Sequence, residues 1–399
     1  MNLKNSIKNY GIKGTLKITW NTKITSIIAK IINVFTKNKP LLDEIVIESH
    51  NDFDCNGGAF YNYLIKNGYN KKYKIIWLTR KKYKENLPQN VELVPLYGPS
   101  IKRAYHLCLA KYFSYDCEVI TKIRKDQIVV YCSHGAGGFK NIKGKMIIPD
   151  FIDYILLQSP NYMPIQANQW SISKNDSRIV YIGYPSHDIF FNPSQNEMSK
   201  IIKKKYKKII LWMPTFRKVS GYNRNDSSKE QKLGIPLIDK LEEYENLNKT
   251  LEEKNIFLII KLHPKQDLSA LGIMDLSNIK VLTGETVKKL NIDNYNLIKY
   301  SDALISDYSG VAYEYLQLDR PIAYVLDDMK DYKNGFVVDD IHELIAGHEI
   351  YNYNDLISFL DDLSNDNDRY KNKRDKIRDY IYKYHDGKSC ERLAKLLKL

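Results

Sequence analysis

The fold is decided by the stretch Ser301-Asp302-Ala303-Leu304-Ile305-Ser306-Asp307-Tyr308-Ser309-Gly310-Val311-Ala312-Tyr313-Glu314-Tyr315. Its residues 303–305 predict a short apolar strand, and a helical run begins at Val311 after a polar turn. This succession makes an anion site in α/β proteins, because the free N–H groups of the helix N-terminus point beyond the turn. We predict Ser309 as the helix cap, with Gly310 leaving room for a phosphate. An ordinary capped helix in a doubly wound sheet fits the stretch as well.

Apolar runs and helical runs alternate on both sides of this stretch. Strands are expected at residues 44–48, 74–78, 127–132, 153–157, 178–182, 209–213, 256–262 and 321–326, with helices at 56–67, 100–113 and 239–254. Strands that alternate with helices indicate parallel sheets, which hold ligands at the carboxyl ends of their strands.

The chain of 399 residues is long enough for two domains. A polar, proline-containing stretch at residues 192–196 marks the boundary between them. We predict Rossmann-like domains over residues 41–195 and 196–375, and a C-terminal helix over residues 376–399 that packs back on the first domain.

A glycine-rich loop directly after the strand at residues 127–132 is the first candidate site element. Its site candidates are His134, Gly135, Gly137, Gly138 and Lys140. Histidine is the side chain best suited to accept a proton near neutral pH, although a lone histidine is more often a packed or surface residue. The position at a strand end, among glycines, favours a catalytic base here.

The second half of the chain offers three further elements. His263 stands just past the strand at residues 256–262, beside Lys261, and Arg217 follows the strand at residues 209–213. An arginine there can hold a phosphate or carboxylate through two hydrogen bonds, and a surface arginine is the ordinary alternative. The turn that contains Asp307 is the last element. Such elements at strand ends of both halves indicate a cleft between two Rossmann-like domains, the GT-B arrangement, with a nucleotide in the second domain.

The formal net charge of +14 indicates anionic partners: a nucleotide, a nucleic acid, a phosphate polymer or an acidic membrane surface. No helix-turn-helix, RNP or zinc pattern accompanies the charge, so a nucleic acid is the disfavoured alternative. The five cysteines form no CxxC pair, which indicates reduced thiols in the cytoplasm. No carboxylate cluster has the spacing of magnesium ligands, and no bound metal is expected.

Residues 1–40 contain eight lysines and no acidic residue. A basic amphipathic helix of this kind fits the surface of an anionic membrane, and no run reaches the roughly 18 apolar residues of a membrane span. A helix that packs on the domain behind it is the alternative. The apolar face is predicted to consist of Ile24, Ile27, Ile28, Ile31, Val34 and Phe35.

Taken in order, these residues resemble the CDP-glycerol glycerophosphotransferase family of teichoic acid and capsule synthesis, from about Glu44 to the C-terminus. Singly the motifs are weak, but six in family order are a specific signal. They are His134-Gly-Ala-Gly-Gly-Phe-Lys140, Gly183-Tyr-Pro185, Pro214-Thr-Phe-Arg217, Lys261-Leu-His263-Pro264, Ser306-Asp-Tyr-Ser309 and Asp386-Gly387.

The resemblance implies an enzyme that moves glycerol phosphate from CDP-glycerol to a hydroxyl of a lipid-linked glycan or polyol-phosphate acceptor and releases CMP. It implies a peripheral protein at the cytoplasmic face of the membrane, without a tightly bound cofactor. The first domain would take the acceptor, with His134 as the base, and the second the CDP-linked donor. His263 and Arg217 would stabilise the diphosphate, and Ser309, with the turn at Asp307, would seat the donor's phosphates.

Three features depart from the pattern of the polymerising enzymes. The first motif is one residue longer than His-Gly-Thr-Pro-Leu-Lys, and the long extra N-terminal part of many polymerases is lacking. The longer motif places the chain closer to the primase-like branch, which adds the first unit. The lack of the N-terminal part favours a short-product or single-addition enzyme. Pro185-Ser186-His187-Asp188 stands where Pro-Arg-Asn-Asp is frequent. A CDP-ribitol donor therefore stays open, as does a GT-B glycosyltransferase with another nucleotide donor.

Overall fold

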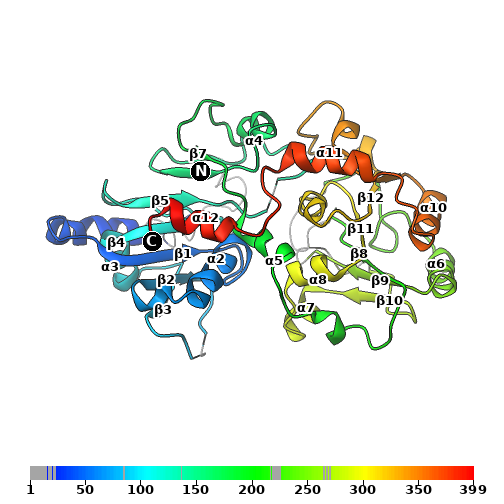
Figure 1. Cartoon of the computed structure of the whole chain (residues 1–399), viewed down its shortest axis with the longest axis horizontal. Helices are drawn as coiled ribbons and strands as arrows, with labels where there is room; N and C mark the ends of the chain where they lie inside the picture. Colours follow the sequence, from blue (N-terminus) through cyan, green and yellow to red (C-terminus); the bar gives the residue numbers. More distant parts are fainter. Residues whose placement is uncertain are drawn as a thin grey trace.

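The computed structural model describes residues 16, 20, 24–83, 86–135, 137–215, 217, 226–263, 266, 268 and 271–399. These residues form two lobes side by side, each built on one parallel β-sheet covered by helices (Figure 1). The two-lobed α/β architecture agrees with the fold class predicted from the sequence.

The N-terminal lobe contains, within the described residues, a seven-stranded sheet in the order β3-β2-β1-β4-β5-β6-β7. Its strands are fully parallel and apolar on both faces, because helices cover both sides. The strands are β1 (Leu42–Glu48), β2 (Lys74–Thr79), β3 (Val91–Pro95), β4 (Ala110–Tyr115), β5 (Ile128–Tyr131), β6 (Tyr154–Leu156) and β7 (Ile179–Val180). The helices are α2 (Cys55–Lys66), α3 (Ile101–Leu109) and α4 (Met163–Trp170).

The C-terminal lobe contains a six-stranded parallel sheet, again within the described residues, in the order β10-β9-β8-β11-β12-β13. The strands are β8 (Lys208–Trp212), β9 (Ile256–Lys261), β10 (Ile279–Leu282), β11 (Ala303–Ser306), β12 (Ile322–Val325) and β13 (His348–Ile350). The helices are α6 (Leu241–Glu253), α7 (Gly284–Lys289), α8 (Asn294–Tyr300), α9 (Val311–Tyr315) and α10 (Tyr353–Ser364).

Each sheet reverses its strand order once, between β1 and β4 in the N-terminal lobe and between β8 and β11 in the C-terminal lobe. At such a point neighbouring loops run to opposite faces of the sheet and leave a crevice outside the carboxyl ends of the strands. The fold therefore provides two crevices, one in each lobe.

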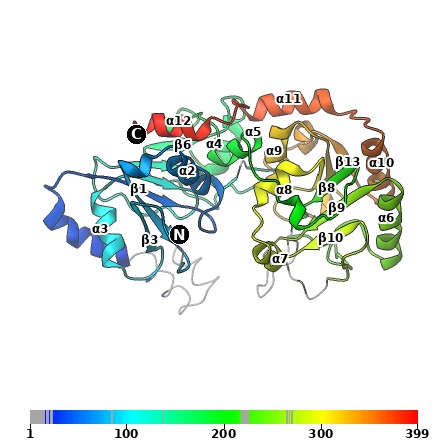
Figure 2. The ribbon, with the colours of Figure 1, turned by 60° about the horizontal axis from the view of Figure 1, so that its bottom comes forward.

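The last two helices join the lobes. Helix α11 (Lys371–Ile381) lies over the C-terminal lobe and α12 (Ser389–Leu396) over the N-terminal lobe (Figure 2). The carboxylate of Asp188, in the short linker helix α5 (Asp188–Phe191), accepts hydrogen bonds from the backbone N–H groups of Ser389 and Cys390, both at 2.8 Å. This carboxylate satisfies two donors that the first turn of α12 leaves open.

The structure differs from the sequence predictions at several elements, among them one helix and one edge strand. The helix predicted at residues 100–113 ends at Leu109, and β4 follows it at once. The residues after the helix include the β-favouring Tyr112 and Phe113, which lie in the middle of the sheet. Strand β3 has no counterpart among the predictions, because its charged and proline-bounded sequence hides a partly exposed edge strand.

Residues 24–36 are helical. The remainder of the basic segment 1–40 lies outside the described residues, except for Leu16, Trp20 and residues 37–40. One face of the helix packs on the lobe: Ala29 is fully buried, and the Thr25 hydroxyl donates a hydrogen bond to the Gly98 carbonyl at 2.9 Å. Ile28 belongs to this packed face, not to the exposed apolar face predicted for it.

Candidate active site

A polar cavity of about 160 Å³ lies where three strands of the C-terminal lobe end. Strands β8, β9 and β11 are neighbours in the sheet and flank its reversal point. The described residues that line the cavity are Lys140, Met213, Pro214, Thr215, Lys261, His263, Ser309 and Gly310. Five residues predicted as site residues from the sequence therefore meet at one cavity, and Lys140 reaches it from the other lobe.

Lys261 is the most buried cation of this cavity, with 6% of its surface exposed. Burial disfavours the charged ammonium group and lowers the pKa of Lys261 to about 8. An anionic ligand beside this amine would favour the charged form and raise that pKa again. The site thus gains positive charge when an anion enters it.

The turn after β11 differs in detail from the prediction. Helix α9 has Gly310, not Ser309, at its cap position, and it continues into a 3₁₀ turn at Leu316–Leu318. The Ser309 hydroxyl accepts a long hydrogen bond, 3.5 Å, from the Val311 N–H group. The hydroxyl points at the helix start but holds it weakly.

The glycine-rich loop of the N-terminal lobe packs directly on this turn. A Cβ atom on Gly310 would lie 2.2 Å from the carbonyl oxygen of Gly137, so the group that approaches Gly310 is protein backbone. The loop then pairs with the C-terminal lobe: Lys140 and Phe336 form an antiparallel bridge, and the Val337 N–H group donates to the Phe139 carbonyl at 2.9 Å. These hydrogen bonds hold the loop so that Lys140 lines the cavity.

Arg217 lies elsewhere than predicted. It is 4% exposed, and its guanidinium group donates to Asp328 at 2.6 and 3.0 Å and to Asp307 at 2.9 Å. Burial alone would raise the pKa of Asp328, but the hydrogen bonds and charge of Arg217 hold it below its ordinary value. Arg217 is not among the described residues that line the cavity, because two carboxylates already satisfy it.

The Asp307 carboxylate likewise contacts other protein groups and is not among the described residues that line the cavity. Its fully buried carboxylate accepts hydrogen bonds from the Thr215 N–H group, at 3.0 Å, and from the Thr215 hydroxyl. The Arg217–Asp307 pair thereby fixes the loop after β8 against the turn after β11. Both residues position the cavity wall.

Asn56, which the sequence did not single out, holds the loop of His134. This fully buried side chain donates to the Ser133 carbonyl at 2.8 Å and accepts from the N–H group and hydroxyl of Ser186 at 3.0 and 2.9 Å. It ties the His134 loop to the linker between the lobes. His134 itself is exposed, and its ring stacks on that of His50 with 4.8 Å between centroids.

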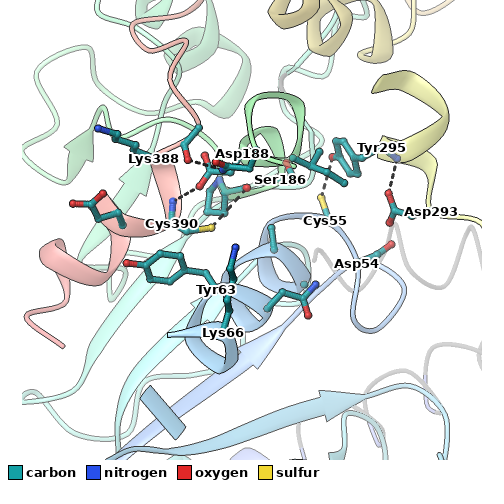
Figure 3. Close-up of a pocket in the computed structure, with 18 of the residues that line it drawn as sticks. Asp54, Cys55, Tyr63, Lys66, Ser186, Asp188, Asp293, Tyr295, Lys388 and Cys390 are labelled. Atoms are coloured by element: carbon teal, nitrogen blue, oxygen red, sulfur yellow. Dashed lines mark hydrogen bonds between the residues drawn. The ribbon is translucent and has the colours of Figure 1, made fainter. Parts of the chain in front are cut away.

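A second cavity, of about 560 Å³, lies between α2, the linker, α8 and α12 (Figure 3). Cys55 and Tyr295 meet on its wall across the lobe boundary, with 3.8 Å between thiol and hydroxyl. The Tyr295 hydroxyl also donates to Glu314 at 3.3 Å, and Glu314 lies beside Gly135. None of the predicted catalytic or phosphate-binding residues is among the described residues that line this cavity.

Comparison with known proteins identifies the family. The model of the CDP-glycerol:poly(glycerophosphate) glycerophosphotransferase family matches residues 31–399. The chain belongs to this family. It is therefore an enzyme, a glycerophosphotransferase, as the motifs had predicted.

The glycerophosphotransferase has curated relatives of similar length. The teichoic acid glycerol-phosphate primase of Bacillus subtilis (strain 168) is 25% identical over 86% of this chain and 89% of its own. A teichoic acid poly(glycerol phosphate) polymerase of Bacillus spizizenii is 27% identical over 79% and 82% of the two chains. A teichoic acid ribitol-phosphate primase of the same species is 24% identical over 73% and 75%.

A solved structure shares the fold. A variant of the wall teichoic acid polymerase TagF matches the glycerophosphotransferase with a TM-score of 0.71 and 20% identity, covering 93% of this chain and 92% of that one. A TagF crystal soaked with CDPG matches with a TM-score of 0.68. These matches agree with the pair of parallel-sheet lobes described above.

Proposed function

We propose that this glycerophosphotransferase adds glycerol phosphate from CDP-glycerol to a hydroxyl of a lipid-linked glycan or polyol-phosphate acceptor, in teichoic acid or capsule synthesis. The acceptor oxygen forms a bond to the phosphorus that carries glycerol. The bond from that phosphorus to the bridging oxygen of the diphosphate breaks, and CMP leaves.

The residues of the two lobes divide this work. His134 accepts the proton of the attacking hydroxyl, since an alcohol attacks phosphorus well only as it loses its proton. Lys140, Lys261 and His263 neutralise the charge that develops on the diphosphate as CMP departs. The hydroxyl of Ser309 contacts a phosphate oxygen of the donor.

One observation carries the proposal: cationic and proton-bearing side chains from both lobes line one polar cavity at a strand-order reversal. Lys140 is supplied by the loop of His134 in the N-terminal lobe, whereas Lys261, His263 and Ser309 belong to the C-terminal lobe. Transfer between two substrates needs such a meeting point, because each lobe then presents one reactant.

Release of CMP tests the reaction. We expect release from CDP-glycerol that depends on a lipid-linked disaccharide acceptor, with CDP-ribitol assayed beside it because the relatives include a ribitol-phosphate primase. Acceptor-dependent release from CDP-ribitol alone would make the enzyme a ribitol-phosphate transferase. Silence with both donors would contradict the proposal.

The role of His134 is tested by His134→Ala. We expect the variant to lose acceptor-dependent CMP release by roughly 100-fold or more while its affinity for CDP-glycerol is retained. His342→Ala is the matched control, because that side chain is 39% exposed beside β13. A fully active His134→Ala enzyme would exclude His134 as the base.

The lipid-linked acceptor leads to a second proposal, that the helix at residues 24–36 docks on the membrane at its cytoplasmic face. Opposite the packed face, Ile27, Ile31, Val34 and Phe35 are 53% to 79% exposed. Helix α3 holds this helix in place through a hydrogen bond from the Cys108 thiol to the Ala29 carbonyl at 3.0 Å. An apolar face flanked by lysines fits the interface of an anionic bilayer. None of the described helices is long and apolar enough to cross one.

Point variants test the docking better than a deletion, since Ala29 belongs to the core of the lobe. Ile31→Glu with Phe35→Glu should abolish binding to vesicles that contain anionic lipid, and should reduce transfer to lipid-linked acceptors more than to soluble analogues. Met274→Glu, at a side chain 66% exposed on the other lobe, is the control. Unchanged vesicle binding in the double variant would contradict the proposal.

A further inference from the structure

Three neighbouring strands of the N-terminal lobe are each followed, within three residues, by a side chain of a type that can bind a metal ion. His50 follows β1, Cys117 follows β4 and His134 follows β5, and these strands lie side by side at the point where the sheet order reverses. The His50 Nδ1 and Cys117 Sγ atoms are 3.3 Å apart. The ligand atoms of all three residues lie within 4.8 Å of one another.

The donor set selects a class of metal. Two imidazole nitrogens and one sulfur suit Zn²⁺ and are poor ligands for Mg²⁺ or Ca²⁺, which bind oxygen. Tetrahedral zinc with Zn–N near 2.0 Å and Zn–S near 2.3 Å separates its ligand atoms by about 3.5 Å. The contact between His50 and Cys117 already meets this distance. Both histidine side chains are exposed, so rotation of His134 can close the remaining gap of about 1 Å.

A neighbouring carboxylate orders the backbone around the thiol. Glu48 pairs with the Arg80 guanidinium group at 2.7 Å. Glu48 also accepts hydrogen bonds from the N–H groups of Asp116 and Cys117, at 3.1 and 2.9 Å, which holds the thiol at its strand end.

We propose that His50, Cys117 and His134 bind Zn²⁺, and that the bound ion inhibits the transferase by occupying the ring nitrogen of His134. On binding, the S–H bond of Cys117 breaks, its proton passes to water, and an S–Zn bond forms. The inhibitory step rests on the proposed role of His134 as the base, whereas the binding step does not. The three ligands are far apart in the chain, so the sequence contains no motif with metal-ligand spacing that would predict the site.

Cobalt spectroscopy tests binding without any reference to activity. The wild-type enzyme titrated with Co²⁺ should show the near-ultraviolet thiolate-to-cobalt charge-transfer absorption, and Zn²⁺ should displace it. Cys117→Ser should lack this absorption, whereas Cys55→Ser, at another half-buried thiol, should retain it. A wild-type enzyme without the absorption, or a Cys117→Ser variant that keeps it, would overturn the site.

Inhibition is then measured as acceptor-dependent CMP release against Zn²⁺ concentration, with each rate normalised to that variant's own rate in EDTA. We expect wild-type inhibition that EDTA reverses, and at least a roughly tenfold higher half-inhibiting concentration for Cys117→Ser. Equal inhibition of both enzymes, or stimulation by zinc, would overturn the inhibitory role. A cobalt signal in an enzyme that does not release CMP would leave the metal site standing and remove the proposed function instead.

Discussion

Gly310 touches Gly137 across the lobe boundary, and a Cβ atom on Gly310 would lie only 2.2 Å from the Gly137 carbonyl oxygen. The backbone of Gly310 has φ −60°, which any residue adopts, so the contact and not the conformation requires glycine. Gly310→Ala should therefore push the His134 loop away from the polar cavity at the ends of β8, β9 and β11. We expect acceptor-dependent CMP release to fall by roughly 100-fold, the cost of about 1 Å of misplacement between reacting groups.

Gly144→Ala is the matched control for this substitution. Gly144 has φ +75° and nothing within 4 Å of an added Cβ atom, so its replacement strains the backbone without a collision. The control should lose some stability and keep its activity. An active Gly310→Ala enzyme, with small-angle scattering unchanged from the wild type, would show that the lobes yield at this contact without consequence.

Most of the strand ends that form the polar cavity could be predicted from the sequence. Buried parallel strands appear as continuous apolar runs, and a polar residue just past such a run, such as His263 or His134, falls at the ligand-binding edge. The same rule would have found His50 after β1. It could not find Cys117, because the prediction extended a helix through β4 and so removed the strand that positions this thiol.

Contacts between segments that are distant in the chain could not be predicted from the sequence. A cation after a strand, Arg217, was predicted as a phosphate ligand because the chain does not reveal that Asp307 and Asp328, from two other strand ends, neutralise it. The close approach of Gly310 to Gly137 is hidden for the same reason. The local pattern of apolar and polar residues predicts where strands end. Which of the side chains at those ends can contact a ligand depends on how distant segments pack together.

Arg217 should act on stability. Arg217→Met leaves the buried carboxylates of Asp307 and Asp328 without their cation, which costs about 3–5 kcal/mol of unfolding free energy, measured by urea denaturation. Arg178→Met, which breaks the more exposed pair with Asp176, should cost less than about 1 kcal/mol. If Arg217→Met has unchanged stability and a raised KM for CDP-glycerol, Arg217 is a phosphate ligand and not a structural residue.

Lys261 should make donor binding depend on pH. Because burial lowers its pKa to about 8, the amine is charged below pH 8 and increasingly neutral above it in the free enzyme. A diphosphate binds the charged form, so each binding event above pH 8 must take up a proton. The KM for CDP-glycerol should then rise by up to about tenfold per pH unit above 8. Lys261→Arg, which stays charged, should remove the rise; a wild-type KM that is flat from about pH 7 to 9.5 would contradict the assignment.

His187 should make the fold acid-sensitive. Its ring is buried against Tyr184, Phe190 and Tyr382, and neither ring nitrogen has a hydrogen-bond partner among the described residues. Burial lowers its pKa from 6.5 to about 3. Between pH 6.5 and about 3, His187 is therefore protonated in the unfolded chain and neutral in the folded chain. The stability present above pH 6.5 is lost progressively as the pH falls toward 3.

At pH 5 this loss amounts to about 2 kcal/mol, because each unit of pKa difference is worth about 1.4 kcal/mol. His187→Phe keeps an aromatic ring in the site and cannot take up the proton, so its unfolding free energy should fall less between pH 7 and pH 5 than that of the wild type. His342→Gln, at a partly exposed ring, should lose as much as the wild type. If His187→Phe and the wild type lose stability in parallel, the acid sensitivity belongs to other groups.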